Sequence, residues 1–256
     1  MTAARKFVWY DVMTTDVRAA EEFYHKVVGW SAKDSGMIDR SYTIFSAGDV
    51  SVGGLMPLTD EARGMGIPPC WTGYVGVDDV DAFATRVKQA GGTIHRPPED
   101  IPGVGRFAVV ADPQGAAFIL FKGAGDAPPG AIAPGTAGHI GWHELYAGSL
   151  QGAWEFYSTL FGWTKAEAID MGAMGPYQLF AAGAEPIGGM MTKPAEIPHP
   201  CWLYYFNVDA IDAAAERVKT NGGTVVNGPH EVPGPMYIVQ CMDPQRAMFA
   251  MVAPKR

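Results

Sequence analysis

One long segment of this sequence occurs twice, and the repeat constrains the fold more than any other feature. Residues 7–30 read FVWYDVMTTDVRAAEEFYHKVVGW, and residues 140–163 read IGWHELYAGSLQGAWEFYSTLFGW. The two segments share a Trp, an acidic residue, a Phe-Tyr pair and a Gly-Trp pair at the same spacing. A repeat of about 130 residues is too long for a solenoid unit and has the size of a small domain. We therefore expect one domain that has been duplicated.

The ends of the repeat predict the domain boundaries. We place the first domain at residues 1–123 and the second at residues 139–256. The segment between them, residues 124–138, consists mainly of Gly, Ala and Pro and is typical of a linker. A chain of 256 residues is long enough for two domains with substantial cores.

Composition excludes several classes of partner. The net charge is −8, so the sequence offers no basic surface for nucleic acid. It contains neither the ~20 consecutive apolar residues of a membrane span nor an apolar run of signal-peptide length near its start. Three cysteines without a CxxC pair suit a reducing compartment better than a disulfide framework. We expect a cytoplasmic protein without membrane or nucleic-acid partners.

Each copy is predicted to run strand, helix and three strands, twice over. Residues 7–13 are rich in Val and aromatic side chains, which favours a strand. Asp16 can cap the N–H groups of a following helix, and Gly29 can end that helix in a left-handed conformation. A second helix is expected to open at Asp78 in the first copy and at Asp209 in the second.

A glycine pair interrupts one predicted strand in each copy. The pairs are Gly53-Gly54 and Gly188-Gly189. Glycine inside a strand marks a bulge or the close approach of another group. The pairs therefore either leave space for a ligand or bend the sheet, and both readings stay open here.

The sequence contains the Phe-Tyr and Gly-Trp pairs, the segment VDDVD and the turn DPQG. In these motifs it resembles the vicinal oxygen chelate superfamily, which includes glyoxalase I, bleomycin-resistance proteins, fosfomycin-resistance enzymes and extradiol dioxygenases. The fused copies are similar to an actinobacterial two-domain glyoxylase-like group that includes a mycobacterial culture-filtrate protein. The resemblance implies an α+β fold with four βαβββ units forming two tandem domains. It also implies that each sheet curls into a cup and that the two halves pair as an intrachain pseudo-dimer.

Metal-binding members of this superfamily hold a divalent ion in the cup with His, Gln and Glu side chains. Carried over onto this sequence, the three ligand positions fall on Trp9, Thr72 and Ile119 in the first copy and on Trp142, Leu203 and Ala250 in the second. None of these side chains is a usual ligand for a divalent metal. A slip of one residue would offer Tyr10 or His143, which point to the other face because strands alternate. We therefore expect no metal and no other cofactor.

The same alternation places polar and aromatic side chains on the inner face of each cup. The candidate acid–base residues are Asp11 and Glu144. The candidate ligand-contact residues are Trp9, Thr72, Tyr74, Trp142, Tyr146, Tyr205 and Asn207. An aromatic wall with few polar anchors is typical of a small-molecule pocket. The two acids either anchor or activate a ligand or make structural hydrogen bonds, and their presence in both copies favours the structural role.

Three functions follow from this pattern. The favoured hypothesis is a metal-independent protein that binds a small molecule for sequestration or resistance, in aromatic-lined cups. The alternative is a glyoxalase-like lyase, isomerase or hydrolase that uses Asp11 or Glu144 as acid or base. A third possibility is a structural role with both cups filled by side chains. The expected partner is a small-molecule ligand.

Overall fold

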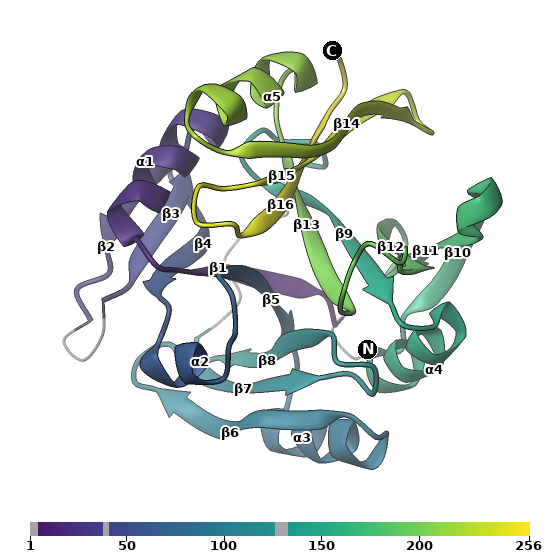
Figure 1. Cartoon of the computed structure of the whole chain (residues 1–256). Coiled ribbons are helices and arrows are strands. Elements are labelled where there is room, and N and C mark those ends of the chain that lie inside the picture. The colour runs from purple at the N-terminus through teal and green to yellow at the C-terminus, as the bar shows by residue number, and fades with distance from the viewer. Residues whose placement is uncertain (1–4, 38–40, 126–132) are drawn as a thin grey trace. The chain divides into compact units, whose positions relative to one another are not determined.

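The structure, a computed structural model, describes residues 5–37, 41–125 and 133–256. This part of the chain is built from four successive modules, each of one strand, one helix and three strands (Figure 1). The first module contains β1 (Phe7–Thr14), α1 (Val17–Val28), β2 (Ser31–Asp34), β3 (Thr43–Ala47) and β4 (Val50–Pro57). The second contains β5 (Cys70–Gly76), α3 (Val80–Gln89), β6 (Thr93–Ile101), β7 (Gly105–Ala111) and β8 (Ala117–Gly123).

The second copy repeats this arrangement. The third module contains β9 (Ile140–Ala147), α4 (Leu150–Phe161), β10 (Thr164–Asp170), β11 (Pro176–Ala181) and β12 (Pro186–Thr192). The fourth contains β13 (Cys201–Asn207), α5 (Ile211–Thr220), β14 (Thr224–Val232), β15 (Met236–Met242) and β16 (Met248–Ala253). Two short helices, α2 (Asp60–Gly64) and the 3-10 helix η1 (Gly172–Met174), lie outside the pattern. The predicted order of elements is confirmed.

The strands form two eight-stranded sheets. Their orders are β2-β3-β4-β1-β5-β8-β7-β6 and β10-β11-β12-β9-β13-β16-β15-β14. Within each module the first strand runs parallel to the last, and the other paired strands are antiparallel. A parallel pair needs a long crossover, which the helix and the two intervening strands supply. The α+β class with two tandem domains is therefore confirmed.

Compact units of this chain mix the two sequence copies. One unit, here called the middle unit, combines α3 and β6–β8 of the second module with α4 and β10–β12 of the third. The other, the terminal unit, combines α1 and β2–β4 of the first module with α5 and β14–β16 of the fourth. Modules from opposite copies therefore pack together inside each unit.

In the terminal unit, three motifs from both copies meet at one buried tyrosine. The Tyr24 hydroxyl on α1 donates to Asp243 Oδ2 at 3.0 Å and accepts a hydrogen bond from Trp71 Nε1 at 2.8 Å. Asp243 Oδ1 accepts from the backbone N–H groups of Gln245 and Ala247, which closes the Asp-Pro turn. Tyr24 is completely buried, so every partner in this network replaces water.

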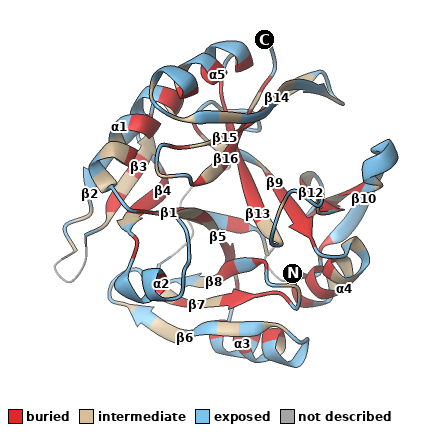
Figure 2. Ribbon diagram, viewed as in Figure 1, coloured by how far each residue is buried: buried red, intermediate tan, exposed pale blue. Residues whose placement is uncertain are grey.

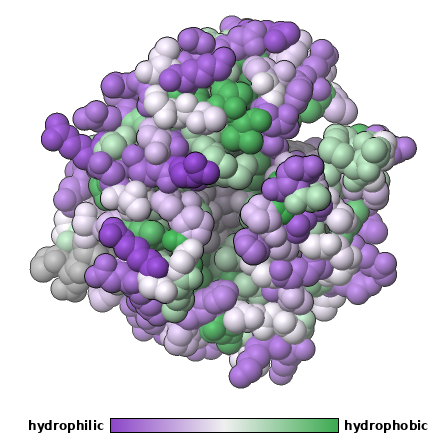
Figure 3. Space-filling view, viewed as in Figure 1, coloured by the Kyte–Doolittle hydropathy of each residue, from purple (hydrophilic) through white to green (hydrophobic). Residues whose placement is uncertain are grey.

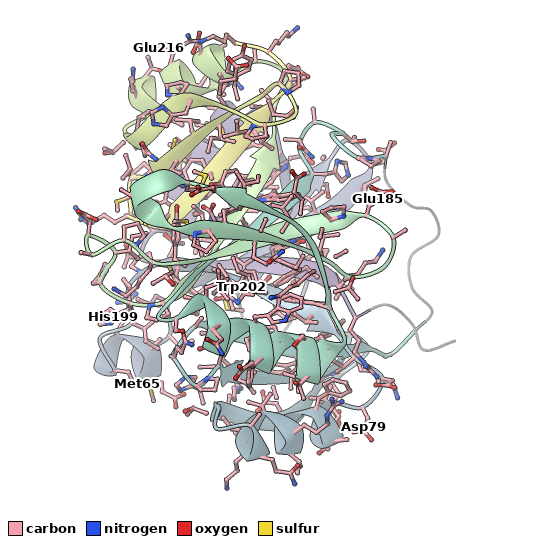
Figure 4. All side chains as sticks on the ribbon, turned by 90° about the vertical axis from the view of Figure 1, so that its right-hand side faces the viewer. Met65, Asp79, Glu185, His199, Trp202 and Glu216 are labelled. Carbon is pink, nitrogen blue, oxygen red and sulfur yellow. The ribbon has the colours of Figure 1, made fainter. Side chains whose placement is uncertain are left out.

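The middle unit repeats the network with the copies exchanged. The Tyr157 hydroxyl on α4 donates to Asp112 Oδ2 at 3.1 Å and accepts from Trp202 Nε1 at 3.1 Å. Figure 4 shows Trp202 close to α4. The Phe-Tyr, Cys-Trp and Asp-Pro motifs of the sequence thus serve one structural purpose, with the aspartate always supplied by the opposite copy.

In each unit, an arginine binds the C-terminal end of a neighbouring helix; this arginine belongs to α5 in the terminal unit and to α3 in the middle unit. Arg217 of α5 donates to the Val27 carbonyl oxygen at 3.0 Å in the terminal unit. Arg86 of α3 donates to the carbonyl oxygens of Thr159 and Leu160 in the middle unit. The last carbonyls of a helix have no intrahelical partner and carry partial negative charge, so a guanidinium there is stabilising.

The residues predicted to cap the helices can be compared with the caps in the structure. Asp16 caps α1 by accepting from the Ala19 N–H at 3.0 Å, and Gly29 ends this helix with φ +89°. The cap of α3 is Asp79 rather than the predicted Asp78. In the fourth module, α5 begins after Ala210 without a side-chain cap, so the prediction for Asp209 was wrong. Acidic residues occur close together at the start of these helices, so the sequence allows more than one of them to be the cap. Only the backbone geometry of the first turn distinguishes these possibilities.

Buried residues are concentrated in the inner strands of each sheet and on one side of each long helix, whereas the edge strands β2, β6, β10 and β14 contain none (Figure 2). On α1 the buried face is Ala20, Phe23, Tyr24 and Val27, as the helical spacing predicts. Among the described residues, no helix is long and apolar enough to cross a membrane. The predicted linker 124–138 is only partly covered, because residues 126–132 lie outside the described residues.

Removing either buried hydroxyl should destabilise the fold. Tyr24→Phe or Tyr157→Phe leaves an aspartate oxygen and an indole N–H without their shared partner, so we expect each to lower the free energy of unfolding by about 2 kcal/mol. Tyr237→Phe, on half-buried β15, is the control and should change it by less than ~0.5 kcal/mol. Urea unfolding followed by circular dichroism measures all three. Equal values for the three variants would contradict the role given to the networks.

Candidate functional site

The first predicted carboxylate lies in a cluster formed by Trp9, Asp11 and Tyr42, here called the first carboxylate cluster. Asp11 Oδ1 accepts from Trp9 Nε1 at 2.9 Å and from the Tyr42 hydroxyl at 2.7 Å. Trp9 Nε1 also lies 2.8 Å from the Tyr42 oxygen, so the three groups form a closed triangle. The bond between residues two apart on β1 shows that Trp9 and Asp11 share one face, as the strand alternation predicts.

Gly54 makes room for this cluster. It is paired with Asp11 between the parallel strands β1 and β4. A Cβ atom at Gly54 would overlap the Tyr42 hydroxyl and Asp11 Oδ1. The space left by the second glycine of the pair is therefore used by a tyrosine of the protein itself. The sequence left open whether Gly54 leaves space for a ligand or bends the sheet, and the structure shows that Tyr42 fills this space.

The middle unit contains the second carboxylate cluster, formed by Trp142, Glu144 and Tyr177. Trp142 Nε1 donates to the Tyr177 hydroxyl at 2.9 Å, and Tyr177 is hydrogen-bonded to Glu144. Gly189 is paired with Glu144, and a Cβ atom at Gly189 would overlap the Tyr177 ring. The indole, carboxylate, phenol and glycine of the first cluster thus recur, with a longer acid.

Sequence reasoning missed both tyrosines. A signal was present, because SYTIFSAG at residues 41–48 aligns with PYQLFAAG at residues 176–183. This alignment puts Tyr42 on Tyr177 and needs an offset of 135, two more than the offset of the first repeat. The same offset of 135 relates the glycine pairs Gly53-Gly54 and Gly188-Gly189, but the prediction did not extend this alignment to the two tyrosines.

Both phenols are held in the neutral form. Burial, followed by the charge of Asp11, raises the pKa of Tyr42 far above its usual value. Burial and the Glu144 charge act in the same way on the pKa of Tyr177. Each tyrosine is therefore a hydrogen-bond donor to its carboxylate throughout the physiological range of pH.

Exposure divides each cluster into a buried part and an accessible part. Asp11 and Glu144 are only 4% and 7% exposed, whereas Trp9, Tyr42 and Trp142 are half-buried. The accessible surface of both clusters therefore belongs to aromatic rings, and the carboxylates fix these rings from behind. Such a surface can stack against a flat or cationic molecule.

The remaining predicted contact residues are mostly buried. Tyr74, Tyr146, Tyr205 and Asn207 are each less than 9% exposed, and Thr72 is half-buried. The Tyr74 ring packs edge-on against Phe121. Tyr146, like Tyr74 and Thr72, belongs to the middle unit, whereas Tyr205 and Asn207 belong to the terminal unit. The structure thus joins Trp9 to Asp11 both directly and through Tyr42, and it groups Trp142 with Glu144 through Tyr177.

The six positions carried over from metal-binding relatives do not fit a divalent ion. They are Trp9, Thr72, Ile119, Trp142, Leu203 and Ala250, and their side chains offer at most one hydroxyl oxygen. Ile119 and Ala250 are also buried. In the part of the chain that the structure describes, no three His, Cys, Asp or Glu side chains gather where they could hold a metal.

A separate shallow cavity of about 590 Å³ lies on the α4 side of the middle unit. Its lining consists of Ser149, Leu150, Gln151, Trp154, Glu155, Lys165, Pro176, Gln178 and Thr192. None of these is a predicted site residue, and the Lys165 ammonium lies 5.2 Å from the Trp154 ring. Figure 3 shows apolar residues in separate patches among hydrophilic ones. The cavity and the carboxylate clusters are thus distinct features.

His143 is a buried structural residue in the middle unit. Its ring stacks on Phe7 with centroids 4.3 Å apart, and its Nδ1 lies 2.6 Å from the Ile187 carbonyl oxygen. Burial lowers its pKa to about 4. The ring is therefore neutral at physiological pH and donates from Nδ1 to the carbonyl.

The fold and the repeated site define the class of this protein. The family described as Glyoxalase/Bleomycin resistance protein/Dioxygenase superfamily matches residues 6–120 and again residues 137–251. The chain belongs to this superfamily, with two tandem copies of its domain.

Individual relatives cover almost the whole chain. CFP32 of Mycobacterium tuberculosis (strain CDC 1551 / Oshkosh) is 32% identical over 248 residues, covering 96% of this chain and 94% of CFP32. The anthracycline biosynthesis protein DnrV of Streptomyces peucetius is 33% identical over 261 residues, covering 95% of this chain and 91% of DnrV.

Solved structures show the same fold at low identity. The Mn(II)-bound glyoxalase from Novosphingobium aromaticivorans has a TM-score of 0.68 and 16% identity, covering 99% of this chain and 83% of that chain. The 2,3-dioxygenase LapB from Pseudomonas sp. KL28 has a TM-score of 0.68 and 13% identity, covering 99% and 93%. At these identities the likeness concerns the fold alone.

Filling the glycine space should disrupt each cluster. Gly54→Ala and Gly189→Ala place a methyl group on the tyrosine of the cluster, and we expect each to lower the free energy of unfolding by about 2 kcal/mol. The control is Gly64→Ala in α2, where an added Cβ meets no atom within 4 Å. Chemical denaturation compares the three variants. A Gly54→Ala protein as stable as Gly64→Ala would show that the space is not filled by Tyr42.

His143 should make stability depend on pH. Its pKa rises from about 4 in the folded chain to its ordinary value of 6.5 on unfolding, so the unfolded state binds more protons between these values. Stability should therefore rise by up to roughly 3 kcal/mol from pH 4 to 6.5 and be lost as the pH falls again. His143→Tyr, which introduces the residue found at position 10 of the first copy, should remove this component. Urea unfolding of both proteins across this range tests it, and an unchanged pH slope contradicts it.

Proposed function

We propose that this protein binds small, flat organic molecules, one against the indole ring of Trp9 in the terminal unit and one against that of Trp142 in the middle unit, without a metal at the positions used by metal-binding relatives. Binding serves to sequester or carry the molecule. The proposal extends the membership of the superfamily to a particular kind of ligand and a particular surface.

The observation that carries the proposal is the fixed orientation of each indole ring. In the first cluster, the indole N–H is held by Asp11 and Tyr42 together, while the ring itself stays half-buried. In the second, Trp142 is held by Tyr177, which Glu144 holds in turn. An aromatic surface ordered before the ligand arrives binds with less loss of side-chain entropy. Mostly apolar contact with a few polar anchors is also what small-molecule sites provide.

The names of two relatives support a particular class of ligand for this proposal. DnrV of Streptomyces peucetius and DauV of Streptomyces sp. (strain C5) match at 33% identity over 95% of this chain, and both are named anthracycline biosynthesis proteins. Anthracyclines contain a flat, hydroxylated anthraquinone. A polycyclic aromatic compound with hydroxyl or carbonyl groups therefore suits both the relatives and the stacked surface proposed here.

A second candidate function is acid–base catalysis by Asp11 or Glu144, in a glyoxalase-like lyase, isomerase or hydrolase. Two observations favour it: both copies bury a carboxylate at this position, and the relative CFP32 carries the name of a glyoxylase. Binding is the better supported function, because indole and phenol groups of the protein itself donate hydrogen bonds to these carboxylates.

Ligand titration should depend on the two indole rings. With 4,5-dihydroxyanthraquinone-2-carboxylate as the probe, we expect quenching of tryptophan fluorescence and measurable heat of binding. Trp9→Leu and Trp142→Leu should each weaken the site to which they belong by about tenfold, because a stacked ring contributes roughly 1–2 kcal/mol. The control is Trp154→Leu, which removes a half-buried indole on α4 and should leave the affinity within about twofold.

Two outcomes would contradict the proposal. One is a wild-type protein that binds no planar aromatic probe, and the other is a stoichiometric transition metal found by elemental analysis of the purified protein. The double variant Asp11→Asn/Glu144→Gln separates the candidate functions. Turnover of a hemithioacetal or related substrate that disappears in this variant would favour catalysis over binding alone.

A further inference from the structure

A line of hydrogen-bonded side chains crosses the fourth module, and neither the fold nor the carboxylate clusters explain it. In the strand register, Tyr205 of β13 is paired with Ala250 of β16. Ala250 is also paired with Gln240 of β15, and Gln240 with Asn227 of β14. Four residues on four strands thus stand in one row in the terminal unit.

Hydrogen bonds join three of these side chains, Tyr205, Gln240 and Asn227, and continue to His230 on the same strand as Asn227. Gln240 Nε2 donates to the Tyr205 hydroxyl oxygen at 3.1 Å. Asn227 Nδ2 donates to Gln240 Oε1 at 3.4 Å, and Asn227 Oδ1 lies 2.7 Å from His230 Nε2. Tyr205, Gln240, Asn227 and His230 are here called the polar row.

Ala250 allows the polar row to form. Its side chain is a single buried methyl group, so the Gln240 amide can pass over it to reach Tyr205 two strands away. Tyr205 and Gln240 are 2% and 8% exposed, whereas Asn227 and His230 are exposed. The row therefore leads from the surface of β14 to a buried phenol.

The second module provides an internal control, because it has the same strands in the same order. There Tyr74 is paired with Ile119, Ile119 with Val109, and Val109 with Arg96. Two branched aliphatic residues thus replace the alanine and glutamine of the polar row. The Arg96 guanidinium pairs instead with Glu99 on its own strand.

This comparison indicates that the fold does not require the polar row. Burying an amide and a phenol costs free energy unless every hydrogen bond is kept, and aliphatic side chains avoid that cost. The second module builds the same four strands with Ile119 and Val109. A buried polar group that the architecture does not need is a candidate for recognition.

We propose that the polar row recognises a hydroxyl group of a ligand bound in the terminal unit, whereas the corresponding row of the second module has Ile119 and Val109 in place of Ala250 and Gln240 and offers no amide for this purpose. The two halves of the protein are then not equivalent, and the polar end of the ligand is selected in the fourth module. Gln240 and Tyr205 determine this specificity, and Asn227 and His230 hold Gln240 in place. This inference rests on the proposed binding function and adds the ligand chemistry that one half selects.

The test compares two probes that differ only in their hydroxyl groups: 4,5-dihydroxyanthraquinone-2-carboxylate and anthraquinone-2-carboxylate. Wild-type protein should bind the dihydroxy probe about tenfold more tightly, which is the difference that one or two buried hydrogen bonds make. Gln240→Met, which keeps the length of the side chain, should abolish this preference and leave the affinity for the other probe within about twofold. Isothermal titration calorimetry measures both affinities for each variant.

Two further variants keep the test independent of folding defects. His230→Ala changes an exposed residue, so the protein should fold normally and lose about threefold in affinity for the dihydroxy probe alone. Val109→Met changes the residue of the second module that corresponds to Gln240 and should leave the ratio of the two affinities unchanged.

The outcomes separate this inference from the proposed function. If Gln240→Met and His230→Ala keep the wild-type ratio while Trp9 and Trp142 still govern binding, the polar row is not the recognition element and the proposed function stands. If the wild-type protein binds neither probe, the proposed function and this inference are both wrong.

Discussion

The hydrogen bond between the Tyr24 hydroxyl and the Asp243 carboxylate joins residues 219 positions apart, and Tyr157 and Asp112 repeat it in the other unit. Each tyrosine is completely buried and also accepts from an indole N–H. Since an unsatisfied buried carboxylate is costly, this bond commits each aspartate to a helix from the opposite copy. The interleaving of the two copies within each compact unit depends on this commitment.

The carboxylate clusters use the same chemistry for another purpose. In both, a phenol and an indole surround an acid, but here the indole keeps part of its surface exposed. A buried tyrosine network can thus tie modules together, whereas a half-buried one can order an aromatic surface for a ligand. The sheet has a glycine opposite each acid, and any larger residue at that glycine would overlap the tyrosine. The glycine is therefore what allows the tyrosine to occupy its position.

Much of the fold could be predicted from the sequence because its determinants are local. Alternation put Trp9 and Asp11 on one face, and their hydrogen bond confirms this. Asp16 begins and Gly29 ends their helix as expected, whereas the choice between Asp78 and Asp79 depended on one turn of backbone geometry. Strand alternation and helix caps depend on residues that are close together in the sequence, so the sequence was sufficient to predict these elements.

The rest of the candidate site depends on register between distant strands. Tyr42 reaches Asp11 only because β3 and β4 bring residues 31 positions apart together, which alternation along a single strand does not reveal. Gln240 reaches Tyr205 across an intervening strand, which no periodicity in the sequence reveals. The domain boundaries at residues 123 and 139 remain a prediction.

The pairing of Tyr24 with Asp243 has a consequence for how such a chain can diverge. Each tyrosine is matched to an aspartate in the other copy, so the two copies cannot drift apart independently after duplication. Substitutions that co-vary among relatives should therefore link position 24 with position 243 and position 157 with position 112. Co-variation between these positions would show, from sequences alone, that each duplicated half evolves in dependence on the other.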